Sequence, residues 1–197
     1  MKYEKKGIIV VGEHTKKLFE GFVLNQKVPE EIIQKYKGII PDEMIEVWNE
    51  YGFGMTADGY LKVINPDEYY EELISIFSYV NDDIVPVFIT GMGEVIAFND
   101  HGYLLYVNVR YQSWDLIGKK FELTMKRMKT EDFRNHVLAW SPYKEAVERY
   151  GSLKYEECFG YEPLLSLGGG EGVENLRKVN LKVHLDIISH MQEIITF

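Results

Sequence analysis

Three short apolar runs follow one another in the middle of the chain, where residues 85–109 read VPVFITGMGEVIAFNDHGYLLYVNV. The runs cover residues 85–90, 94–98 and 103–109 and are rich in valine, isoleucine and aromatic residues, which favour strands. Glycine-containing turns separate them. Such short connections join antiparallel neighbours, because parallel strands need a long crossover. The stretch therefore predicts an antiparallel meander at the centre of the fold.

Helix signals dominate the sequence before these strands. Apolar residues recur at helical spacing over residues 29–37 and 41–51, and each pattern begins with proline and acidic residues and is followed by glycine. Asp58-Gly59 lies between two apolar runs and predicts a hairpin turn. Asn65-Pro66 then predicts the start of another helix, which continues to Phe77.

The sequence after the strands is less regular. Residues 115–129 are rich in lysine and ambiguous, whereas residues 130–140 and 141–150 favour helices. A compact segment over residues 153–172 precedes a final helix predicted for residues 181–195.

These elements predict an α+β protein with an N-terminal helical lobe, a central antiparallel sheet and C-terminal helices, packed as one compact body. The natural division gives a first unit of residues 1–112 and a second of residues 113–197. No linker rich in proline, glycine or serine marks it. We therefore expect the two units to pack against each other.

The charge balance narrows the class of partner. The chain has 197 residues with 22 Lys+Arg against 31 Asp+Glu, which gives a net charge of -9. Phosphate backbones and anionic membrane surfaces attract basic proteins, so neither nucleic acid nor membrane is an expected partner. The charged N-terminal stretch lacks a signal-peptide core, and no run approaches the ~18 apolar residues of a membrane span. We expect a cytoplasmic protein. The simplest interpretation of its net negative charge is that it keeps the protein soluble.

No set of residues has the spacing of a catalytic or metal site. His184 and His190 are six residues apart and so lie on different sides of a helix. Cys158 is the single cysteine, which excludes an intramolecular disulfide, and its carboxylate neighbours favour a buried thiol over a nucleophile. The sequence therefore predicts a protein that is not an enzyme, with no catalytic residues, no metal and no cofactor.

The most glycine-dense stretch is LGGGEGVEN at residues 167–175. Consecutive glycines can bind an anion through their N–H groups, but Glu171 stands where a phosphate loop needs a positive charge. A tight turn is the favoured interpretation. The alternative is a small-ligand or nucleotide site that combines this run with the preceding aromatic and acidic residues: Tyr155, Glu156, Glu157, Phe159, Tyr161, Gly168, Gly169 and Gly170.

Two blocks of sequence resemble known bacterial families. The first begins with VPEEIIQKY at residues 28–36, continues through IPDEMIEVWNEYGFG at residues 40–54 and NPDEY at residues 65–69, and ends with VFITGMGE at residues 87–94. It resembles the GAD-like domain. The second reads YEECFGYEPLLSLGG at residues 155–169, with VHLDII further on. It is similar to the C-terminal domain of type VI secretion immunity proteins that neutralise a DNase effector.

This resemblance implies a non-enzymatic inhibitor that binds a cognate protein toxin, expected to be a basic nuclease. An acidic surface associates faster with a basic partner and competes with nucleic acid for it. Interfaces of this kind combine aromatic anchors with a charged rim. The residues expected at the interface are Tyr69, Tyr70, Asp82 and Asp83. Two other hypotheses stay open: the small-ligand site above, and a regulatory interaction protein without a toxin partner.

Overall fold

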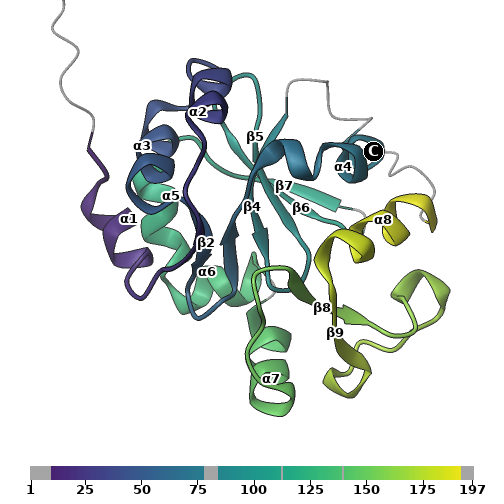
Figure 1. Ribbon diagram of the computed structural model, residues 1–197. Helices are drawn as coiled ribbons and strands as arrows, with labels where there is room; N and C mark the ends of the chain where they lie inside the picture. The colour runs from purple at the N-terminus through teal and green to yellow at the C-terminus, as the bar shows by residue number, and fades with distance from the viewer. Residues whose placement is uncertain (1–9, 78–83, 112, 139, 192–197) are drawn as a thin grey trace, which may run out of the picture.

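A seven-stranded antiparallel sheet forms the centre of the molecule in the computed structural model, which describes residues 10–77, 84–111, 113–138 and 140–191 (Figure 1). The strands lie side by side in chain order, each paired with the next. They are β1 (Val23–Gln26), β2 (Phe53–Thr56), β3 (Leu61–Val63), β4 (Val85–Thr90), β5 (Val95–Phe98), β6 (Leu104–Asn108) and β7 (Ser113–Gly118). The predicted meander is confirmed as β4, β5 and β6, and it extends further on both sides.

The central strands β4, β5 and β6 are apolar at nearly every position, as expected for strands whose two faces are both covered by helices. All residues of β4 and β5 are buried. The two edge strands differ: every residue of β1 is exposed, as are the first four of β7. These edges lack the continuous apolar run, so their strand character is weak in the sequence.

One face of the sheet carries the larger hydrophobic core. Five helices cover it (Figure 1): α1 (Glu13–Leu18), α2 (Glu30–Tyr36), α3 (Asp42–Tyr51), α5 (Phe121–Met128) and α6 (Glu131–His136). Trp48 lies at the centre of this core, with its ring centroid 5.7 Å from that of Tyr36 and 5.8 Å from that of Phe53. Helices from both halves of the chain therefore build one core.

The opposite face is covered by α4 (Tyr70–Phe77) and α8 (Leu181–Met191) (Figure 1). Leu73 of α4 and Leu185 of α8 belong to a second core cluster with Ile89, Val95 and Val107 of the sheet. None of the helices in the described ranges is long and apolar enough to cross a membrane.

The remaining elements lie outside these two helical layers. They are α7 (Trp140–Tyr150), the antiparallel pair β8 (Glu157–Tyr161) and β9 (Leu176–Asn180), and the single-turn helices η1 (Pro66–Glu68), η2 (Leu165–Leu167) and η3 (Val173–Asn175). The predicted cap is confirmed, since the Asn65 side chain accepts a hydrogen bond from the Asp67 N–H at 3.2 Å. The hairpin turn is also confirmed, with positive φ at Ala57, Asp58 and Gly59.

Three predictions of local structure need correction. The single helix predicted from Asn65 to Phe77 is divided, because η1 ends at Glu68 and α4 begins at Tyr70. The ambiguous lysine-rich segment forms most of β7 and all of α5. The helix predicted over residues 130–140 is shorter, because α6 ends at His136 and the next helix begins at Trp140. The last helix is described to Met191, and the rest of its predicted range lies outside the described residues.

The two predicted units form one compact body. Strand β7 of the second unit completes the sheet by pairing with β6. Gly12 caps α1 without a side chain, and the Glu122 carboxylate of α5 instead accepts hydrogen bonds from the N–H groups of His14 at 3.0 Å and Thr15 at 3.2 Å. A distant residue thus supplies the cap that the local sequence lacks. The division at residue 112 remains a prediction.

Candidate functional site

The two sequence blocks meet at the end of the sheet where β4 turns into β5. The Phe159 N–H of β8 donates to the Gly91 carbonyl at 2.8 Å, and the Tyr155 hydroxyl donates to the Val63 carbonyl at 2.9 Å. Gly93 adopts a positive φ, and a side chain there would contact His184 and Cys158. The VFITGMGE motif is therefore a docking point for β8.

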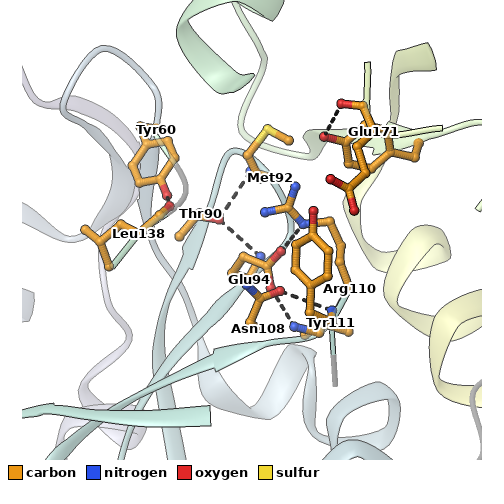
Figure 2. A network of polar contacts seen from close by, with 11 residues as sticks. Tyr60, Thr90, Met92, Glu94, Asn108, Arg110, Tyr111, Leu138 and Glu171 are labelled. Carbon is orange, nitrogen blue, oxygen red and sulfur yellow. Dashed lines mark hydrogen bonds and ion pairs between the residues drawn. The ribbon is translucent and has the colours of Figure 1, made fainter. Parts of the chain in front are cut away.

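A buried ion pair fixes this junction from within. Glu94 is fully buried, and its carboxylate accepts from the Arg110 guanidinium and from the Val109 N–H at 2.5 Å. Figure 2 shows Arg110 reaching Glu94 beside the ring of Tyr111. Burial raises the pKa of Glu94, while Arg110 and the backbone N–H groups favour its charged form. A pair so completely covered is part of the protein interior and does not meet a partner.

A solvent-facing groove of about 640 Å³ lies beside this junction, and we call it the junction groove. Its walls come from β1, from η1 and the start of α4, from the segment before β8, and from the start of α8. It combines two tyrosines with four carboxylates and a single lysine. The lining residues are Asn25, Glu68, Tyr69, Glu72, Tyr155, Glu156, Asn180, Lys182, Val183 and Asp186.

Glu72 is the most buried carboxylate of the groove, at 8% exposure. Its Oε1 atom lies 3.3 Å from Lys182 Nζ, and its Oε2 atom is buried without a hydrogen-bond partner. Lys182 is 55% exposed, and this surface cation contacts only one of the two oxygens. A buried carboxylate oxygen without a donor is costly, and the groove is a place where an incoming cation would satisfy it.

The structure places the predicted partner-binding residues Tyr69 and Tyr70 in two different depressions of the surface. Tyr69 lies in the junction groove, where burial and the charge of Glu68 raise its pKa. Tyr70 is 59% exposed and lines a different depression, of about 790 Å³, together with Asp67. Asp82 and Asp83 lie outside the described residues.

The alternative small-ligand residues are divided as well. Tyr155 and Glu156 line the junction groove. The Glu157 carboxylate accepts from the Lys154 N–H at 2.9 Å. Phe159 is fully buried in the larger core, as is almost all of Tyr161, whose hydroxyl donates to the Glu171 carbonyl at 3.2 Å. Most of the aromatic part of this set is thus used for packing.

The glycine run serves close backbone contact. A Cβ atom on Gly169 would lie 1.9 Å from the Pro163 carbonyl oxygen, whereas Gly168 faces open space with a φ of 84°. We expect Gly169→Ala to lower the free energy of unfolding by about 2–3 kcal/mol, because the backbone must shift. Gly168→Asn is the control and should change it by less than about 1 kcal/mol, since asparagine tolerates positive φ. Chemical denaturation measures both, and equal effects would contradict this interpretation.

Cys158 and His184 are buried behind the same junction. Burial raises the pKa of the Cys158 thiol to about 12, which leaves it protonated and unreactive at neutral pH. Burial, helped by the charge of Arg110, lowers the pKa of His184 to about 4. Both side chains are therefore neutral under physiological conditions, as expected for packing residues.

Sequence reasoning missed Glu68, Glu72, Lys182 and Asp186. Lys182 and Asp186 have the four-residue spacing of a shared face on α8, whereas Glu68 ends η1 and Glu72 lies in α4. Nothing local indicates that these residues meet in one groove, because the two pairs lie more than a hundred residues apart in the sequence.

Comparisons with known proteins agree with this architecture. Residues 13–110 match the model of the GAD-like domain, and residues 119–192 match the model described as T6SS immunity protein Tdi1, C-terminal. The first match defines the class, a GAD-like domain protein. The second match is to the C-terminal domain of type VI secretion immunity proteins, and together the two matches confirm the resemblance drawn from the two blocks.

The fold has a relative among solved structures. The crystal structure of Atu4351 from Agrobacterium tumefaciens superposes with a TM-score of 0.74 at 18% sequence identity. The match covers 90% of this chain and 87% of that one, so the likeness extends over nearly the whole fold. A search among curated proteins gives no match.

Proposed function

We propose that this protein binds and neutralises a cognate toxin of a type VI secretion system, that the toxin is a nuclease, and that the protein acts in the cytoplasm without being an enzyme. The observation that carries the proposal is the match of residues 119–192 to an immunity-protein domain. The nuclease target rests on the charge of the chain.

The net charge of -9 suits a partner that binds phosphates. A nuclease needs a basic surface to hold its substrate, and an acidic inhibitor is drawn to that same surface. The junction groove supports this picture, since it offers four carboxylates against one lysine. The buried groups Glu94, Arg110 and His184, by contrast, line no part of the junction groove, which supports inhibition by binding over catalysis.

The proposal is tested with a candidate type VI toxin whose gene lies next to this one. We expect purified protein to stop degradation of plasmid DNA by that toxin at a 1:1 ratio. The association rate should fall at least tenfold as salt rises from about 50 to 300 mM, because screening weakens electrostatic steering. Gel electrophoresis and stopped-flow fluorescence measure the two effects.

Different failures have different meanings. If co-expression does not protect cells from the toxin, the immunity function is wrong. If cells are protected but the toxin leaves DNA and RNA intact, only the nuclease assignment is wrong.

A further inference from the structure

We infer that the junction groove is an arginine-binding site, which takes a guanidinium group from the surface of the toxin. The inference rests on the proposed function and deepens it, because it names the part of the acidic surface that makes the central contact. The groove lies where the two family-matched segments meet, so that both contribute to it.

The first argument is the state of Glu72. This carboxylate is nine-tenths buried, yet one of its oxygens has no donor. An ammonium group is a point charge and satisfies one oxygen, as Lys182 does at 3.3 Å. A guanidinium presents two parallel N–H donors and satisfies both oxygens of a carboxylate. The carboxylate oxygen of Glu72 that lacks a donor therefore favours arginine over lysine as the ligand.

The second argument is the lining around Glu72. Tyr155 is half-buried and offers aromatic surface, whereas Tyr69 is only 6% exposed and belongs to the second core cluster. Arginine stacks on aromatic faces more readily than lysine. Glu68, Glu156 and Asp186 add negative charge at the rim, and all three are exposed. An aromatic lining with a charged rim is the arrangement found around residues that dominate binding energy.

The third argument is that the chain already places a cation here. Lys182 contacts Glu72 from an exposed position, and an exposed lysine holds a carboxylate only weakly. The contact shows that the groove accepts a cation, and a cation that binds Glu72 more tightly than Lys182 could replace it. A partner's arginine would compete with Lys182, and this competition gives the inference a distinctive test.

The first experiment needs no toxin. Acetyl-arginine amide is titrated into the labelled full-length protein to millimolar concentration, with neutral acetyl-citrulline amide as the matched probe. We expect saturable NMR shifts at Tyr69, Tyr155 and Glu72 with the arginine probe, at least tenfold weaker with citrulline, and lost in Glu72→Gln. Shifts that are equal for both probes, or spread over the surface, would overturn the site.

The second experiment measures toxin affinity in a set of variants. Glu72→Gln should weaken binding at least tenfold. Lys182→Gln should strengthen it severalfold, because the competing cation is gone. Lys37→Gln makes the same charge change at an exposed position outside the groove and should alter affinity less than twofold. Asp186→Asn, on the exposed rim, should weaken binding without the risk of unfolding.

The directions of the affinity changes in Glu72→Gln and Lys182→Gln distinguish a binding role from a merely structural ion pair. If the contact between Glu72 and Lys182 only stabilised the fold, both variants would weaken binding, or neither would change it. Either result overturns the inference. If the wild-type protein does not bind the toxin, the proposed function fails and the partner assignment fails with it, while the arginine titration still decides the chemistry of the groove.

Discussion

Replacing Glu94 by glutamine is expected to lower the free energy of unfolding by about 3–5 kcal/mol, the cost of leaving a buried charge without its partner. The substitution keeps the size of the side chain and removes only its charge. Arg110 stays ionised with 4% of its side chain exposed, and its Nη2 atom already lacks a hydrogen-bond partner. Urea denaturation followed by tryptophan fluorescence gives the change.

A double-mutant cycle makes this prediction specific. Arg110→Met alone should also destabilise, because it leaves the Glu94 carboxylate unpaired. In the double variant the free energy of unfolding should fall by clearly less than the sum of the two single decreases, since neither charge then remains buried alone. Glu145→Gln at an exposed position of α7 is the matched control, expected within about 0.5 kcal/mol of wild type. A loss below about 1 kcal/mol for Glu94→Gln would show that the buried ion pair does not hold the junction together.

Replacing Lys62 by methionine is expected to have the opposite sign and to raise the free energy of unfolding by about 1–3 kcal/mol at pH 7. Lys62 of β3 is fully buried, and its Nζ donates to the Gly59 carbonyl at 3.3 Å. Burial lowers its pKa from 10.5 to about 8. At neutral pH the buried ammonium group of Lys62 therefore lowers the free energy of unfolding. Methionine has a similar length and carries no charge, so it avoids this desolvation cost.

The pH dependence identifies the cause. Between the folded pKa of about 8 and the unfolded value of 10.5, the unfolded chain binds more protons than the folded one, so wild-type stability rises with pH through this window. The advantage of Lys62→Met should be complete below pH 8 and should shrink as the pH approaches 10.5. Unfolding curves from pH 6.5 to 10 measure it, with Lys144→Met, at an exposed position, as the control. An advantage that stays constant over this range would assign the effect to packing instead.

The sheet shows where sequence-based prediction succeeds. Strands β4, β5 and β6 are apolar at nearly every position, and Pro29, Pro41 and Asn65 mark helix starts whose signals lie within a few residues. These features depend on local preferences and were predicted. Strands β1 and β7 were not, because VLNQ and SWDL carry polar residues typical of an edge and become strands by pairing with β2 and β6.

The junction groove, like strands β1 and β7, could be predicted only in part from local sequence. Tyr69 was predicted as a partner contact, and Tyr155 and Glu156 as part of a separate ligand site, yet the fold places all three in one groove. The central carboxylate, Glu72, was not predicted, because an acidic residue in the first turn of a helix is ordinary. Its burial comes from α8, whose contact with α4 joins segments about 110 residues apart.

The sequence by itself determined the α+β class, the central meander, the acidity and the resemblance to the GAD-like and immunity-protein domains. The tertiary structure alone decided which acidic residues share a groove, which carboxylate lacks a donor, and that a residue of α5 caps α1. The physical reason is that helix starts and buried strands are selected by interactions within a few residues. Grooves and ion pairs depend on how helix faces and strand ends meet after chain folding, and that meeting is set by the packing of two cores on opposite sides of one sheet.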